Sequence, residues 1–254
     1  MNTILVPVDF SDTSTNALSY ALKLFGSSPL EVTVLHIYGV ESSALLMRNI
    51  DGILENDAKQ QMSELLNKVR TEYPGVNFKS KIVKSSAVSA IVSLGDSGNY
   101  DFIVMGTKGA SGLKEVFMGS VAGGVITKTS APVIVVPVNH TFRPLETILF
   151  AVGDNPSIDD KVIEPLRNIA SMHKSKVKIL HITDKKTPQI EKALAATKGL
   201  KPKVEYAFGT GDTNKDLNNY LMKDPSALVC LIRGKKGFLD QLLSESVTLK
   251  QTFN

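Results

Sequence analysis

The sequence predicts an α/β protein of two similar domains, each a doubly wound parallel sheet of five strands covered by helices. Short apolar runs of strand length alternate with longer segments of helical periodicity, as in sheets joined by crossover helices. The apolar runs are continuous, so both faces of each sheet are expected to be buried. The same segments recur in the second half of the chain, where a last strand is not recognisable.

Three pairs of matching segments carry the repeat, in the same order along both halves. They are "TILVPVDFSD" from Thr3 with "TILFAVGDNP" from Thr147, "VTVLHIY" from Val32 with "VKILHIT" from Val177, and "DFIVMGTKGASG" from Asp101 with "SALVCLIRGKKG" from Ser226. The apolar pattern breaks at "VNHTFRPLE", where a histidine, a proline and charged residues come together. We therefore expect two domains, residues 1–140 and 141–254.

The elements of the first domain follow from local patterns. Strands are expected at residues 3–9, 31–37, 77–83, 101–106 and 131–137, and helices at 16–25, 54–73, 87–98 and 119–128. Asp12 or Ser14 is expected to cap the first helix, and Pro74 with Gly75 to end the second. The long segment 38–52, beyond the second strand, is the place for a lid if the protein has one.

Composition and charge exclude several classes of protein. The sequence contains no run of 18 apolar residues, so no membrane span is predicted. The N-terminus lacks the basic and apolar regions of a signal peptide. The single cysteine, Cys230, cannot form an internal disulfide, which fits a cytoplasmic protein. The net charge of +4 is mildly basic, but the lysines are scattered and tryptophan is absent, so nucleic-acid binding is not expected.

One stretch is rich in glycine just where the fourth strand ends and a helix is about to begin. Its glycines are Gly106, Gly109, Gly112 and Gly119. Ligands of open parallel sheets bind beyond the carboxyl ends of the strands, and exposed amides at a helix N-terminus attract anions. The stretch thus favours a phosphate cradle, with tight turns and close packing as the alternative. The GxGxxG pattern is absent, and Val125 stands where a P-loop needs its lysine.

The spacing of these glycines resembles the signature of a known family. The sequence has Gly106, two residues, Gly109, nine residues, then Gly119 and Ser120. This is the G-x2-G-x9-G-[ST] pattern of the universal stress proteins, in their subgroup that binds adenine nucleotides. The resemblance covers the first domain from end to end. It implies a Rossmann-like fold of the adenine nucleotide alpha hydrolase type, with ATP as ligand and a divalent cation, Mg²⁺, bridging the phosphates.

The resemblance also assigns residues to the nucleotide. Pro7, Val8 and Asp9 match the end of the first strand, where the family places an aspartate near the adenosine. Ile37 matches a residue that lines the adenine pocket, and Met105 with Gly106 match residues near the base and ribose. Gly109, Gly119, Ser120 and Val121 match those that hold the phosphates. From local sequence alone, Asp9 is equally well explained as a residue that caps its own turn.

Other reactive side chains have simpler explanations. Lys108, Lys114, Thr107 and Ser111 lie in or beside the glycine stretch, where they either steer phosphates or are exposed loop residues. His36 and His181 occupy equivalent places in the repeat, and each is expected to bond to a backbone group. Cys230 is expected to be a buried, inert thiol. No histidine pair has metal-ligand spacing, so no metal site made by the protein is expected.

The second copy has lost the glycine pattern. Aligning "VMGTKG" with "VCLIRG" puts Leu231 opposite Gly106, leaves Gly234 in the place of Gly109, and finds no third glycine. Glu245 brings a negative charge to the place of the phosphates. We therefore expect no ATP in the second domain. No counterpart of "APVIVVP" follows, so a homodimer and a tandem pseudo-dimer both stay open.

Together these observations predict a tandem universal stress protein that binds ATP in its first domain. It would act as a nucleotide-responsive stress or regulatory module, with no catalytic residue and at most slow ATP hydrolysis. Its protein partner is unknown, and neither nucleic acid nor membrane is expected to bind. Two alternatives stay open. One is an enzyme that uses an adenine nucleotide for adenylyl or phosphoryl transfer, and the other is an interaction protein that needs no nucleotide.

Overall fold

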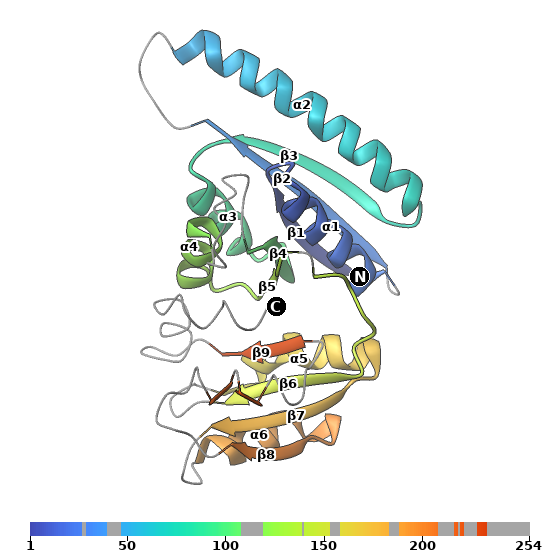
Figure 1. Ribbon diagram of the computed structural model, residues 1–254, viewed down its shortest axis with the longest axis vertical. Helices are drawn as coiled ribbons and strands as arrows, with labels where there is room; N and C mark the ends of the chain where they lie inside the picture. Colours follow the sequence, from blue (N-terminus) through green and yellow to red (C-terminus); the bar gives the residue numbers. More distant parts are fainter. Residues whose placement is uncertain are drawn as a thin grey trace. The chain divides into compact units, whose positions relative to one another are not determined.

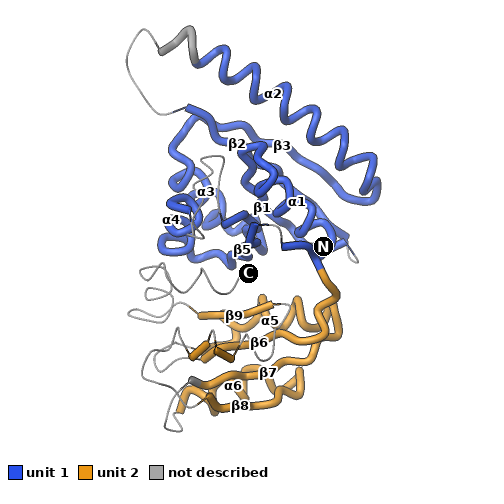
Figure 2. Tube along the Cα trace, viewed as in Figure 1, with its two compact units in different colours: residues 1–142 blue, residues 143–254 orange. Residues whose placement is uncertain are grey.

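The structure is a computed structural model of the 254-residue chain (Figure 1). It divides into two compact units, residues 1–142 and 143–254 (Figure 2), each described here by itself. The description covers residues 1–26, 29–39, 47–107, 119–138, 140–152, 158–182, 188–207, 216–217, 219–220 and 228–232. Within these ranges, no helix is both long enough and apolar enough to cross a bilayer.

The first unit is a five-stranded parallel sheet with the strand order β3-β2-β1-β4-β5. Its strands are β1 (Asn2–Val8), β2 (Leu30–Tyr38), β3 (Asn77–Lys84), β4 (Phe102–Gly106) and β5 (Val133–Val136). Its helices are α1 (Asp12–Phe25), α2 (Met47–Glu72), α3 (Ala87–Gly95) and α4 (Ser120–Lys128). This confirms the predicted doubly wound α/β class.

The helices cover both faces of this sheet. The chain runs from β1 outward to β3, then returns past β1 to β4 and β5. Because parallel crossovers are right-handed, this reversal places α1 and α2 on one face and α3 and α4 on the other (Figure 1). The strands are therefore buried on both sides, which is why their sequences are continuously apolar.

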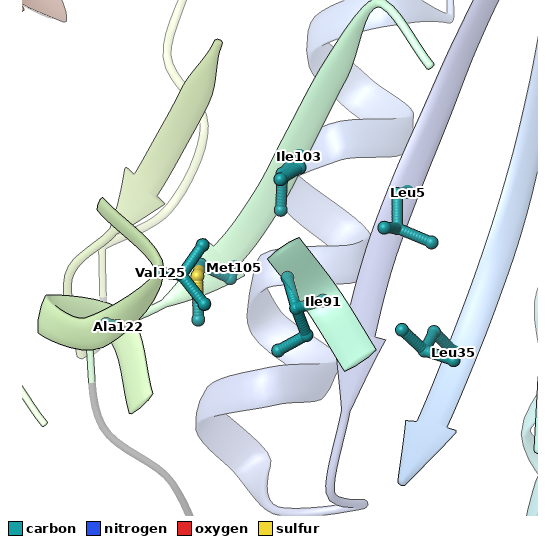
Figure 3. Close-up of a cluster of buried hydrophobic side chains, with 7 residues drawn as sticks. All are labelled: Leu5, Leu35, Ile91, Ile103, Met105, Ala122 and Val125. Carbon is teal, nitrogen blue, oxygen red and sulfur yellow. The ribbon is translucent and has the colours of Figure 1, made fainter. Parts of the chain in front are cut away.

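A cluster of aliphatic side chains forms the core beneath α3 and α4. Figure 3 shows side chains from both layers meeting there. The sheet contributes Leu5, Leu35, Ile103 and Met105, and the helices contribute Ile91, Ala122 and Val125. On the opposite face, Phe102 of β4 packs against Phe25 of α1 with 5.1 Å between ring centroids. Alternate residues of β4 thus supply both cores.

Two helix starts differ from the sequence-based expectation. α2 begins at Met47, not at Leu54, so residues 47–52 of the expected lid segment are helical; residues 40–46 lie outside the described part. Met47, Ile50 and Leu54 continue the helical spacing, and an exposed Gly52 costs a helix only about 1 kcal/mol. α1 is capped by Ser11, neither Asp12 nor Ser14, because the Ser11 hydroxyl accepts from the Ser14 amide.

The segment that leaves β5 is attached to α1. The Asn16 amide Nδ2 donates to the His140 carbonyl at 3.0 Å. The Tyr20 ring lies 5.9 Å from the His140 ring and 5.6 Å from the Phe142 ring, edge to face in the second case. Tyr20 is 4% exposed, and its burial raises the pKa of its hydroxyl. Residues 140–142 therefore belong to the packed structure of the first unit.

The second unit has a four-stranded parallel sheet, in the order β8-β7-β6-β9, among its described residues. Its strands are β6 (Thr147–Val152), β7 (Lys176–Ile182), β8 (Lys203–Ala207) and β9 (Leu228–Leu231), and its helices are α5 (Asp160–His173) and α6 (Pro188–Thr197), with a 3₁₀ turn at Lys198–Leu200. The order repeats β3-β2-β1-β4 of the first unit. Its core includes Leu149, Leu180 and Leu217.

Asp96 joins the end of α3 to the segment before β5. Its Oδ1 accepts from the Thr129 hydroxyl at 2.6 Å, from the Ser130 amide at 2.8 Å and hydroxyl at 3.0 Å, and from the Ala131 amide at 3.2 Å. Burial acts to raise the pKa of this carboxyl, but the hydrogen bonds from Thr129, Ser130 and Ala131 outweigh it and hold the pKa below its usual value.

We expect Asp96→Ala to lower the free energy of unfolding at pH 7 by about 1–2 kcal/mol, because several donors lose their acceptor. Because the pKa of Asp96 is lower in the folded state, its contribution is complete above the unfolded value, about 3.9, and disappears as the pH falls through the folded value. Urea unfolding at several pH values tests this. Asp96→Asn, which keeps one acceptor but does not titrate, separates geometry from charge. A loss that stays constant down to pH 2 would contradict the linkage.

Gly123 and Gly124 of α4 form a matched pair. A Cβ on Gly124 would lie 2.9 Å from Cγ2 of Val88 in α3, whereas a Cβ on Gly123 would meet nothing within 4 Å. We expect Gly123→Ala to stabilise the protein by about 1 kcal/mol, as alanine replaces glycine inside a helix. Gly124→Ala should be less stable than Gly123→Ala by at least about 1 kcal/mol, because it overpacks the contact between α3 and α4. Equal urea midpoints for the two variants would contradict this.

Candidate functional site

The candidate site lies at the carboxyl ends of β1 and β4, where the strand order of the first unit reverses. β1 pairs with β2 at every position from Asn2 to Val8, but with β4 only at Ile4 and Leu5. Pro7 has no amide hydrogen to extend the second ladder. In the second unit, alanine stands in the equivalent place, and the ladder from β6 to β9 continues to Ala151. The strands of the first unit therefore stop pairing just before the site.

Asp9 is held in the turn that follows β1. Its amide donates to the Ser14 hydroxyl at 3.2 Å. Its Oδ1 accepts from the Ser11 hydroxyl at 2.5 Å and from the Ser11 amide at 3.2 Å. These bonds are those of a residue that caps its own turn. They fix the orientation of a half-buried carboxylate at the reversal point, so the turn and a ligand contact are compatible roles.

The next residue, Phe10, has a left-handed backbone with φ of 61°. A bulky residue in this region costs of order 1–3 kcal/mol, and it persists only where its surroundings enforce the conformation. The Phe10 ring stacks on the His36 ring with 4.4 Å between centroids. His36 Nδ1 lies 2.9 Å from the Val8 carbonyl, and His181 Nδ1 lies 2.9 Å from the Val152 carbonyl in the second unit. The predicted backbone bonds of both histidines are thereby confirmed.

The two ends of the glycine stretch are hydrogen-bonded to each other, just after β4 and just before α4. The Gly119 amide donates to the Thr107 carbonyl at 2.6 Å, and the Thr107 amide donates to the Val136 carbonyl at 3.1 Å. Gly119 is the N-cap residue of α4 and makes no side-chain capping bond. The next three amides, of Ser120, Val121 and Ala122, have no carbonyl within the helix to bind. These donors and the positive end of the helix dipole lie at the end of β4.

Apolar side chains border this edge of the sheet. Met105 is 5% exposed and belongs to the core beneath α3 and α4. Ile37 and Val121 are partly buried and pack against the outside of the same cluster, as does Val83, the partner of Ile37 in the register of β2 and β3. Partly exposed aliphatic groups therefore lie near amide donors and a carboxylate at the same edge.

Most of the residues singled out by the sequence thus come from the same end of the sheet. These are Pro7, Val8, Asp9, Ile37, Met105, Gly106, Gly119, Ser120 and Val121. Pro7, Val8 and Met105 are buried, and Ser120 is exposed. Gly109, Lys108, Ser111 and Lys114 lie outside the described residues. Sequence reasoning missed Phe10 and Ser11, and named Ser14 only as a possible helix cap. The serines of "DFSDTS" were a usable sign of a capped turn, whereas the conformation of Phe10 left no sign.

The register of the second sheet corrects the alignment of the two copies. Leu5 pairs with Ile103 in the first unit, and the equivalent Leu149 pairs with Val229. Leu231 is therefore level with Met105, and Ile232 takes the place of Gly106. The letters alone suggested Leu231 opposite Gly106, because strand pairing was unknown. Either alignment puts an aliphatic side chain where the first unit has glycine. Cys230 is partly buried rather than fully buried as expected, and desolvation raises the pKa of its thiol to about 12, which fits an inert cysteine.

The sequence profile of the universal stress protein family matches residues 1–137. Universal stress protein MJ0577 of Methanocaldococcus jannaschii is 31% identical over 152 residues, which cover 52% of this chain and 93% of that protein. A crystal structure of a universal stress protein from Archaeoglobus fulgidus DSM 4304 matches all of this chain and 93% of its own, with a TM-score of 0.70 and 19% identity. That likeness concerns the fold.

A universal stress protein solved in complex with cAMP matches 53% of this chain and 95% of its own, with 21% identity and a TM-score of 0.40. This likeness is too distant to transfer its ligand. The family profile, in contrast, spans more than half of the chain and contains all of the strands of the first sheet. The protein therefore belongs to the universal stress protein family.

Proposed function

We propose that the first unit binds ATP together with Mg²⁺, and that the chain acts as a nucleotide-responsive stress or regulatory module that hydrolyses ATP slowly at most. The observation that carries this proposal is the complete spacing of Gly106, Gly109, Gly119 and Ser120 across a loop whose ends are joined by the bond between Gly119 and Thr107. Such a loop and the N-terminus of α4 suit a phosphate chain.

The rest of the edge suits a nucleoside. Ile37 and Val121 offer aliphatic surface of the kind that contacts a base. Asp9 offers an oriented carboxylate, a strong acceptor for ribose hydroxyls or an exocyclic amine. In our proposal Met105 forms the floor beneath the base, Gly106 permits close approach, and Gly109 with the amides of α4 and the Ser120 hydroxyl holds phosphate oxygens.

The cation fits this arrangement without a protein cage. The described part of the chain has no group of three or more histidine, cysteine or carboxylate side chains that would hold a metal ion. Mg²⁺ commonly binds through phosphate oxygens and water with few protein ligands. When bound, it would neutralise phosphate charge, and the amides of α4 would orient the same phosphates.

We further propose that the second unit is a degenerate universal stress domain that binds no ATP. Its sheet repeats four strands of the first in order, and Ile232 stands in place of Gly106. The likeness to the Archaeoglobus fulgidus structure over the whole chain supports a tandem arrangement of the two domains expected at 1–140 and 141–254, with Phe142 packed on the first of them. A cytoplasmic location, an unidentified protein partner and a dimer or pseudo-dimer complete the proposal.

The first experiment is to purify the protein without added nucleotide, denature it and identify released small molecules by mass spectrometry. A single ATP or ADP per chain supports the proposal, and two per chain would contradict the assignment of the second unit. No nucleotide, followed by no binding in calorimetric titration with ATP and Mg²⁺, would favour the nucleotide-independent interaction protein. Rapid release of AMP or ADP that depends on an added acceptor would favour the transferase.

Gly119→Glu is expected to weaken ATP binding by more than about tenfold, because a carboxylate would stand beside the phosphates. The fold should survive, since φ of −60° at Gly119 suits any residue and an acid at a helix N-terminus is favourable. Gly75→Glu is the matched control, because it adds the same charge where a side chain meets nothing within 4 Å, in the turn before β3. Equal affinities of the two variants in calorimetry would contradict the cradle.

Asp9→Asn is expected to weaken ATP binding by about tenfold, since a neutral amide oxygen is a poorer acceptor than a carboxylate. It should keep the thermal midpoint near that of the wild type, because its oxygen still accepts from Ser11. Asp9→Ala should lose both affinity and about 1 kcal/mol of stability. If Asp9→Asn binds ATP like the wild type, Asp9 serves its turn alone.

A further inference from the structure

Phe10 stands apart from the other residues with a left-handed backbone. Among the described residues, the non-glycine residues with positive φ are Phe10, Lys174 and Lys201. Lys174 ends α5 and Lys201 ends the 3₁₀ turn, so both occupy the ordinary place for this conformation, a helix C-cap. Phe10 instead lies between β1 and α1, at the reversal point of the sheet. No helix end explains its conformation.

The surroundings of Phe10 hold the turn from two sides. On one side, its ring stacks on His36, which is itself fixed to the Val8 carbonyl and is the register partner of Val8. On the other side, Ser11 caps α1 and donates to the Asp9 carboxylate. Asp9 therefore lies between a clamped strand end and a clamped helix start. The left-handed backbone of Phe10 allows the chain to satisfy both constraints within one turn.

Comparison with the second unit shows which of these contacts are common to both sheets. His181 keeps its bond to the Val152 carbonyl and is fully buried, but Gly153 and Asp154 stand where the first unit has Asp9 and Phe10. The bond from histidine to carbonyl is thus common to both sheets. In the first unit the Phe10 ring stacks on His36 and a carboxylate precedes it, whereas in the second unit the His181 ring meets the Tyr206 ring of β8 edge to face, with 6.3 Å between centroids.

We propose that Phe10 is a positioning residue: its left-handed backbone sets the Asp9 carboxylate for a nucleoside, and its ring, stacked on His36, adds to the stability of that backbone conformation without being required for it. This inference rests on the proposed function for its ligand, although the geometry of the turn can be tested without one. It implies that the ability to adopt a positive φ matters more at residue 10 than the identity of the side chain. A glycine is then a competent substitute, and a β-branched residue is not.

The test compares Phe10→Gly with Phe10→Val in the full-length protein. Both variants lose the ring, so they share the loss of packing, but only glycine accepts positive φ freely. ATP with Mg²⁺ is titrated by calorimetry. Amide hydrogen exchange of Asp9, Ser11 and Ser14 is measured by NMR without nucleotide, and thermal unfolding reports the stability of each variant.

We expect Phe10→Gly to bind ATP within about threefold of the wild type, and Phe10→Val to bind at least about tenfold more weakly. Exchange at Ser11 and Ser14 should stay slow in Phe10→Gly, apart from a modest rise due to the lost stack, and become fast in Phe10→Val. Equal affinities and equal exchange in the two variants would overturn the proposal. So would loss of binding in Phe10→Gly with slow exchange, since the ring would then be the contact.

A wild type that binds no ATP would refute the proposed function. The exchange pattern, measured without nucleotide, would still show whether the backbone of Phe10 holds the turn. Slow exchange in Phe10→Gly beside fast exchange in Phe10→Val would support the backbone role. Equal exchange rates in the two variants would contradict the backbone role. A variant that fails to fold would show in the thermal scan; Phe10→Asn, which accepts positive φ more readily than valine, then replaces Phe10→Gly.

Discussion

The structure depends on the parallel pairing of β1 with strands on both of its edges. β2 binds one edge along its full length, and β4 binds the other at two positions only. The chain therefore moves in opposite directions from one central strand, and its right-handed crossovers place helices on opposite faces. No helix connection bridges the carboxyl ends of β1 and β4, and Pro7 ends their ladder early. The candidate site follows from topology and a single missing amide hydrogen.

The two edges of the first sheet use carboxylates differently. At the amino edge, Asp96 accepts from the segment before β5, and Asp101 accepts from the Thr3 amide at 2.7 Å. Both join elements of the scaffold. At the carboxyl edge, the half-buried Asp9 carboxylate accepts from the amide and hydroxyl of Ser11, two residues along the chain. The carboxylates at the amino edge thus link distant segments of the scaffold, whereas the bonds of Asp9 to Ser11 stay within one turn.

Much of the first unit could be predicted from its sequence, because strand and helix periodicities and the glycine spacing are local signals. The sequence located the strands, α4 and the end of the sheet to which Asp9, Gly106 and Gly119 belong. It did not indicate where α2 begins, since Gly52 resembles a helix breaker and the cost of one exposed glycine is small. The alignment of Leu231 with Met105 depends on the pairing of strands that are distant in the sequence. The backbone conformation of Phe10 is supported by the stacking of its ring on His36 of β2. Neither appears in a local pattern.

The attachment of residues 140–142 to α1 has a consequence for how the chain is divided. The family profile ends at residue 137, just after β5, and a fragment cut there would carry every strand of the first sheet. It would also uncover the Tyr20 ring and remove the acceptor of Asn16. An aromatic side chain stripped of its cover on a surface helix invites self-association. A fragment that extends through Phe142 keeps that face closed, so homology alone would place the cut five residues too early.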